Sequence, residues 1–170
     1  MKFNLWQRLD HLLRQLLPAS LVVFLALLQA VPWHLPQFAG VVPLLPMIGI
    51  YYWSLYRPDL MMPWVAFLIG LINDIALGGP IGISSLVFLG IQGMTSSQRR
   101  FFNGKSFLMV WSGFALLAAG GVLIQLTLSS ILFGRTPIAH ALLVEYVLTV
   151  FCYPLPSWLF SQLQLSWLRE

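Results

Sequence analysis

Two acidic side chains stand inside long apolar stretches of this 170-residue sequence, and they are its first candidates for chemistry. Asp74 lies four residues before Gly78, and Glu145 lies in the apolar stretch after Pro137. An ionisable group in apolar surroundings is costly and is often functional or paired. For Asp74 two interpretations stay open. The carboxylate reaches water or caps nearby backbone N–H groups, or it holds the adjacent Gly-Gly-Pro turn as a structural or partner contact.

Glu145 has a polar candidate partner across a short turn. Gln125 comes eight residues before Phe133, and Glu145 comes eight residues after Pro137. In an antiparallel helical hairpin both side chains would therefore lie about 12 Å from the turn. We predict an intramembrane polar contact between Gln125 and Glu145, or a contact of Glu145 with a partner protein. Such a bond contributes about 0.6 kcal/mol on average, which suits specificity better than stability.

Other reactive side chains show no catalytic spacing. The single cysteine, Cys152, has no partner for an internal disulfide, and the three histidines are scattered. No phosphate-binding loop, zinc motif or nucleophile elbow occurs. We therefore expect no catalytic, cofactor-binding or metal-binding residues. A membrane enzyme built from scattered residues is the least supported alternative.

Composition places these residues in a bilayer. Hydrophobic residues make up 59% of the chain and charged residues only 8%, against about 25% charged in an ordinary soluble domain. This composition excludes a soluble globular enzyme, a disordered chain and a disulfide scaffold. No charge occurs from residue 15 to residue 56, a run of 42 residues. One span needs about 20 apolar residues, so this run has room for two.

Glycine, proline and polar clusters divide the chain into six apolar segments. We predict an all-α integral membrane protein, a single transmembrane domain over 1–170. Its spans are expected at about 17–31, 38–56, 60–77, 81–94, 107–133 and 137–160. Residues 1–16 form an amphipathic cytoplasmic helix or a solvated extension of the first span. The fourth span is short and rich in Gly and Ser, which suggests a broken or tilted helix. Pro154 and Pro156 are expected to kink the sixth.

The basic residues predict the orientation, because they gather on the cytoplasmic side of membrane proteins. With six spans, one side carries Lys2, Arg8, Arg14, Arg57, Arg99, Arg100, Lys105 and Arg169. The other side carries only Arg135. Both termini are therefore expected in the cytoplasm.

The stretch from Phe67 to Leu86, FLIGLINDIALGGPIGISSL, is similar to one family. It resembles the bacterial rod shape-determining protein MreD, in which a span ending in Gly-Leu-x-x-Asp leads through a Gly-rich turn into a span of small residues. The length, the six spans and the basic loop before the fifth span are also similar. The matching motif positions are Gly70, Asp74, Pro80 and Gly82.

This resemblance implies a non-enzymatic scaffold of the cell-elongation machinery in the bacterial inner membrane. The implied partners are MreC, the transpeptidase PBP2, the glycosyltransferase RodA and, indirectly, MreB filaments. No nucleic acid and no small-molecule substrate is expected.

A transporter component is the alternative function. The family's fold is similar to the substrate-binding components of energy-coupling-factor vitamin transporters, in which small residues on the first helix mediate docking. Ala26 and Ala30 have the matching spacing. The short 31–38 connection and the few polar residues on the outer side argue against vitamin binding.

The predicted topology can be tested with reporters fused separately to each terminus. Both fusions are expected to report a cytoplasmic location, because eight of the nine basic residues lie on that side. Termini on opposite sides would show that the span count is wrong.

Overall fold

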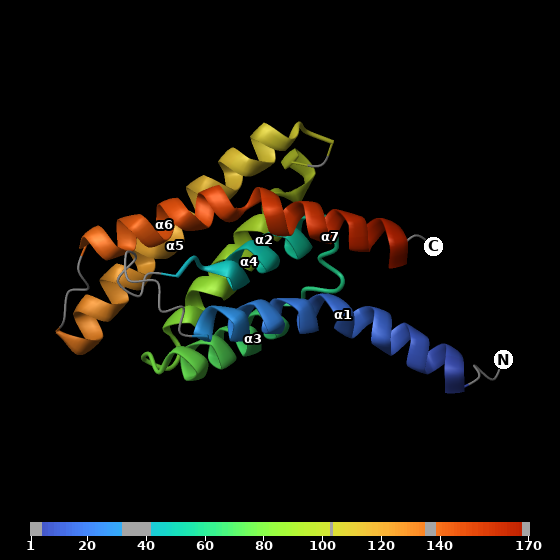
Figure 1. The fold of residues 1–170 in the computed structure, drawn as a ribbon, viewed down its shortest axis with the longest axis horizontal. Helices are drawn as coiled ribbons and strands as arrows, with labels where there is room; N and C mark the ends of the chain where they lie inside the picture. The colour runs from blue at the N-terminus through green and yellow to red at the C-terminus, as the bar shows by residue number, and fades with distance from the viewer. Residues whose placement is uncertain (1–4, 32–41, 103, 135–138, 168–170) are drawn as a thin grey trace.

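The computed structural model describes residues 5–31, 42–102, 104–134 and 139–167. These ranges contain seven helices, which pack as a bundle (Figure 1). They are α1 (Leu5–Ala30), α2 (Leu45–Tyr56), α3 (Pro63–Leu77), α4 (Ile83–Phe102), α5 (Phe107–Phe133), α6 (Ala139–Cys152) and α7 (Pro154–Trp167). The first turn of α1 and the last turn of α7 lie on the same side of the bundle (Figure 1).

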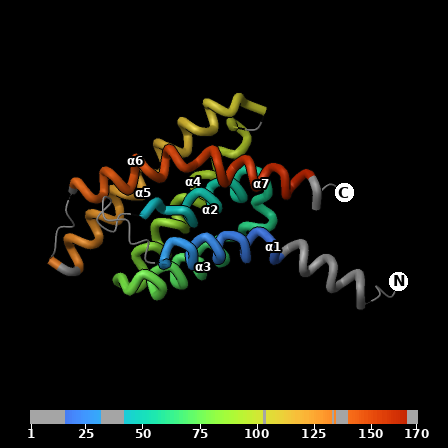
Figure 2. Tube along the Cα trace, viewed as in Figure 1, coloured from blue at the N-terminus to red at the C-terminus, as the bar shows by residue number. Residues whose placement is uncertain are grey.

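Helix α2 is the centre of the bundle. Every residue from Pro46 to Leu55 is buried, and α1, α4, α5, α6 and α7 all pack around it (Figure 2). A helix that is apolar on all sides is expected inside a bundle rather than at its surface. Proline sits in the first turn of α2, where its missing N–H costs nothing.

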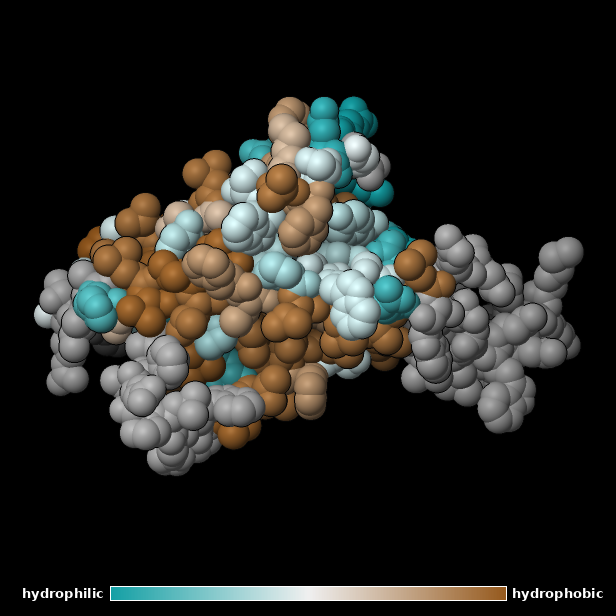
Figure 3. Space-filling model, turned by 45° about the horizontal axis from the view of Figure 1, so that its top comes forward, coloured by the Kyte–Doolittle hydropathy of each residue, from teal (hydrophilic) through white to brown (hydrophobic). Residues whose placement is uncertain are grey.

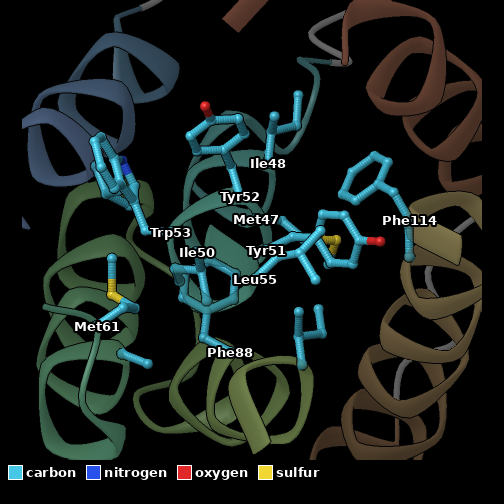
Figure 4. Close-up of a cluster of buried hydrophobic side chains, with 14 of the residues drawn as sticks. Met47, Ile48, Ile50, Tyr51, Tyr52, Trp53, Leu55, Met61, Phe88 and Phe114 are labelled. Carbon is cyan, nitrogen blue, oxygen red and sulfur yellow. The ribbon is translucent and has the colours of Figure 1, made fainter. Parts of the chain in front are cut away.

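The side chains of α2 reach out to several neighbouring helices (Figure 4). The Tyr51 hydroxyl donates to the Val110 carbonyl of α5 at 2.9 Å. The Tyr52 hydroxyl donates to Gln164 Oε1 of α7 at 3.1 Å. At the start of α2, the Leu44 N–H donates to the Thr149 hydroxyl of α6 at 2.9 Å. These bonds fix α2 against the second half of the chain.

The helix bounds differ from several predicted spans. Helix α5 covers the predicted fifth span, 107–133. Helix α4 runs on to Phe102 rather than ending at residue 94, and it is continuous instead of broken. The hydroxyls of Thr95 and Ser97 bond to carbonyls of their own helix, Thr95 to Ile91 at 2.6 Å and Ser97 to Gly93 at 2.9 Å. These residues therefore do not interrupt the helix.

The two ends of the chain also differ from the predicted segments. Helix α1 runs without a break from Leu5 to Ala30, with Pro18 inside it, so residues 5–16 extend the first span directly. The predicted sixth span divides at Tyr153, immediately before Pro154, into α6 and α7. The interruption lies where the prolines were predicted to kink the span, because proline lacks the N–H that would continue the helix. Parts of the second and sixth predicted spans, 38–41 and 137–138, lie outside the described residues.

Two helical stretches are long and apolar enough to cross a membrane within the described residues. They are Phe107–Leu132 and His140–Leu165, with shorter apolar stretches at Leu16–Ala30 and Pro63–Leu77. Helix α2 has 12 residues, or about 18 Å, against a hydrocarbon thickness of about 30 Å. The helical part of this segment is therefore too short to cross the hydrocarbon core of a bilayer by itself.

Helices α3 and α4 approach to backbone contact at Gly70. A Cβ atom placed on Gly70 would lie 2.4 Å from Ser85 Cα and 2.6 Å from Ser85 N. Only glycine fits this position, because the obstructing atoms belong to the α4 backbone and not to a flexible side chain. Close approach through small residues is a common way for membrane helices to associate.

Replacing Gly70 with alanine is therefore expected to destabilise the protein. Forcing α3 and α4 apart should cost about 1–3 kcal/mol, and thermal unfolding in detergent followed by tryptophan fluorescence measures the loss. Gly90→Ala is the matched control, since a Cβ on Gly90 meets nothing within 4 Å. The control should be neutral or slightly stabilising. Equal unfolding temperatures for the two variants would show that the contact at Gly70 is dispensable.

Candidate functional site

Asp74 lies near the end of α3, and its carboxylate binds the start of α4. Its Oδ2 accepts a hydrogen bond from the Gly82 N–H at 2.7 Å, and its Oδ1 accepts one from the Ser84 N–H at 3.1 Å. The side chain is only 4% exposed. Both carboxylate oxygens thus cap a helix that belongs to a different segment of the chain.

An acid suits this position for two physical reasons. The first N–H groups of a helix have no acceptor within the helix, and leaving them bare in apolar surroundings is costly. The helix dipole also places partial positive charge at this end, which favours a carboxylate. The sequence left two interpretations of Asp74 open, and the structure shows the one in which its carboxylate caps backbone N–H groups. Because those N–H groups follow the Gly-Gly-Pro turn, the same bonds also hold that turn.

The turn between α3 and α4 requires two glycines. Gly78 ends α3 with φ 64°, and Gly82 precedes α4 with φ 105°, both in the left-handed region that favours glycine. The N–H groups of Gly78 and Gly79 donate to the Ile75 and Asp74 carbonyls at 3.3 and 3.0 Å, which closes the C-terminus of α3. Pro80 lies between the two helices.

A second polar residue of α3 lies on the same face as Asp74. Asn73 is buried, and its Nδ2 donates to the Ser84 hydroxyl at 3.3 Å. Its Oδ1 and the Ser85 hydroxyl are buried without a hydrogen-bond partner. Asn73, Ser84 and Ser85 were not predicted as site residues. Their position beside Asp74 and Gly82 in an otherwise apolar stretch is the sequence signal that could have located them.

The four predicted motif residues meet at one corner of the bundle. Gly70 permits the contact of α3 with α4, Asp74 caps α4, and Pro80 and Gly82 form the connection between them. A family model described as "rod shape-determining protein MreD" matches residues 10–163 of the 170-residue chain. The chain belongs to the MreD family. Proteins of this family take part in rod-shape determination and reside in the membrane, and this chain is a membrane protein. No curated protein and no solved structure matches the chain.

Gln125 and Glu145 lie apart from the α3–α4 corner, on α5 and α6. These two helices are joined by bonds from Trp111 Nε1 to the Val150 carbonyl at 2.9 Å and from the Tyr146 hydroxyl to the Ala115 carbonyl at 3.2 Å. Both Gln125 and Glu145 are partly exposed. The hydrogen bonds of the described residues do not include one between their side chains. The contact therefore stays a prediction.

The sequence reasoning missed a cavity of about 590 Å³ between α2, α5 and α7. Among its lining residues are Ser157, Ser161 and Gln164 of α7. These three polar residues recur at i, i+4 and i+7, so they share one helix face. That periodicity is the signal that could have located the cavity.

Asp74→Asn is expected to weaken the fold. The carboxamide keeps one acceptor oxygen, so one of the two N–H groups at Gly82 and Ser84 loses its partner, at a cost of about 1–3 kcal/mol. Thermal unfolding in detergent measures the change.

Asp59→Asn provides the matched control for this prediction. The Asp59 side chain is 60% exposed and pairs with Arg57 at 3.4 Å, and such surface pairs contribute about 0–1 kcal/mol. If Asp74→Asn is no less stable than Asp59→Asn, the cap does not stabilise the structure.

Proposed function

We propose that this chain is a non-enzymatic scaffold of the bacterial cell-elongation machinery. In this role it binds MreC, the transpeptidase PBP2 and the glycosyltransferase RodA through its helix faces, and thereby connects indirectly to MreB. The observation that carries the proposal is the family match over 10–163. The Asp74 carboxylate at the α3–α4 corner supports it, because both of its oxygens accept from the protein's own backbone and are committed to holding the fold.

The scaffold is proposed as a six-span protein of the inner membrane with both termini in the cytoplasm. The α4–α5 connection supports this orientation, because Arg99 and Arg100 occupy the last turn of α4 and Lys105 precedes α5. Arg57 follows the end of α2. In Figure 3 most of the strongly hydrophilic side chains gather at the top, where Figure 1 places the end of α4 and the start of α5, and the body below mixes apolar and weakly polar side chains.

Glu145 and Gln125 are proposed as the polar contact that helps to select a partner helix. Each is partly exposed among large apolar side chains that face outward, such as Ile124 and Leu143. A transmembrane helix of a partner with a polar residue at the matching depth would satisfy these groups, which lipid tails cannot do.

The alternative function, a substrate-binding transporter component, has less support. Ala26 is fully buried within the bundle, so it is not available to dock an outside helix. Asn73 and Asp74, two of the few polar residues near the outer ends of the helices, are buried in the α3–α4 contact. They are therefore not free to bind a vitamin.

Depletion of the chain from its own bacterium tests the proposed function. We expect rods to become rounded, and we expect an affinity-tagged copy to restore rods and to co-purify MreC. Cells that stay rod-shaped, with MreC absent from the purified material, would overturn the scaffold. Tight binding of a vitamin in calorimetry would instead establish the transporter function.

The same assay tests the role of Glu145. Glu145→Gln is expected to lower the affinity for the partner about threefold, the equivalent of an average interhelical polar contact, and so to reduce the recovery of MreC or a synthase subunit. Glu170→Gln, the same change at the other glutamate, is the control. If both variants recover equal amounts of the partner, Glu145 is an ordinary packing residue and does not select a partner.

A further inference from the structure

A cavity of about 590 Å³ opens between the end of α2, the start of α5 and one face of α7. Its size lies within the range of about 300–1,000 Å³ that is typical of small-molecule sites. The lining residues are Tyr52, Tyr56, Phe107, Tyr153, Pro154, Ser157, Trp158, Ser161, Gln164 and Leu165. None of them belongs to the α3–α4 corner, so the cavity is a separate feature of the molecule.

One side of the cavity offers hydrogen-bonding groups. The hydroxyls of Ser157 and Ser161 donate to carbonyls of their own helix at 3.0 and 2.7 Å, which leaves their oxygens able to accept. Gln164 accepts from Tyr52 through Oε1, which leaves its amide nitrogen as a donor. The Tyr56 hydroxyl completes this side. A molecule held here must itself carry polar atoms.

The other side of the cavity is aromatic and aliphatic and continues onto the outer surface of α7. Phe107, Trp158 and Leu165 line it, and the neighbouring Leu155 and Leu159 are exposed. Figure 3 shows weakly polar, pale side chains interspersed with brown apolar ones on this face of the bundle. The molecule that fits is therefore amphipathic, with an apolar part that can run along α7.

Basic residues stand at the same end of the bundle. Arg57 follows Tyr56 directly, and Lys105 comes two residues before Phe107. Arg99, Arg100 and Asp59 are further charged residues at this end, and Asp59 pairs with Arg57 at 3.4 Å. The residues named here carry four positive charges and one negative charge, a balance that favours an anionic ligand.

We infer that this cavity binds one anionic glycerophospholipid. Its phosphate lies toward Arg57 and Lys105, its ester oxygens meet the Ser161 and Gln164 side chains, and its acyl chains follow the apolar surface of α7. The Tyr and Trp rings that line the cavity suit this ligand, because such rings commonly lie at the level of the lipid headgroups. The inference does not rest on the scaffold function.

The shape of the cavity argues against a partner helix as the occupant. A transmembrane helix needs an apolar contact over most of the bilayer thickness, about 30 Å. This cavity is confined to the last turn of α2, the first residue of α5 and about three turns of α7, and seven of its ten lining side chains carry a polar atom. A lipid headgroup with its ester region has the matching size and polarity.

Native mass spectrometry of the purified chain tests the inference. The protein is equilibrated in detergent micelles containing equal parts of phosphatidylcholine and phosphatidylglycerol, and the lipid that survives collisional activation is identified. We expect one phosphatidylglycerol to be retained by the wild-type chain. Ser161→Trp fills the cavity and is expected to lower this retention about tenfold.

Ser112→Trp is the matched control, because Ser112 is a helix serine that, like Ser161, bonds to a carbonyl three residues back, at 3.0 Å. It lies outside the cavity and should retain phosphatidylglycerol like the wild type. Should Ser161→Trp not fold, Ser161→Phe takes its place. Equal retention by the Ser161 and Ser112 variants would overturn the site.

A charge variant tests the preference for an anionic lipid. Replacing Arg57 and Lys105 with glutamine is expected to reduce the preference for phosphatidylglycerol over phosphatidylcholine by about fivefold per residue. If the wild-type chain retains the two lipids equally, the assignment of an anionic ligand is wrong. Because the assay uses the isolated chain, its result is independent of MreC binding and of cell shape.

Discussion

A helix that starts in apolar surroundings must find acceptors for its first N–H groups, and this constraint organises the protein. Helix α4 meets it with a side chain from another helix, because Asp74 of α3 accepts from Gly82 and Ser84. The bond works only if α3 and α4 are very close, and Gly70 allows that closeness. Helix α4 in turn packs against α2 and α5, so the capped corner sets the position of much of the bundle.

The centre of the bundle follows from a different property of the chain. Helix α2 has no polar face, so neighbours on every side are needed to bury it. Its aromatic residues combine burial with hydrogen bonds to α5 and α7. Tyr153 joins this cluster at the break between α6 and α7, stacked on Phe114 with ring centroids 4.6 Å apart. The proline break therefore places an aromatic ring in the core.

These two features leave the outer surface of the bundle for interactions. The acid and amide of the α3–α4 corner are used by the fold, whereas Gln125 and Glu145, with Ser161 and Gln164 of α7, remain partly exposed. A member of the MreD family that works by contact would need such a division. In the proposed scaffold, a rigid interior keeps the helix faces in register, and the few polar groups on those faces are the ones we propose to select among partners and lipids.

The sequence by itself determined the class of the protein, the bounds of α5, the interruption before Pro154 and the family motif. Those depend on local composition: scarce charge, an apolar run between two turns, a proline without an N–H, and four motif residues within 70–82. The tertiary structure decided what the sequence left open. Asp74 could have faced water or the turn, and only the approach of α4 brought Gly82 and Ser84 within bonding distance. Likewise, Ser161 and Tyr56 line one cavity because α7 lies beside α2. The bond between Tyr52 and Gln164 that joins these helices links residues more than 100 positions apart, and no local sequence pattern encodes it.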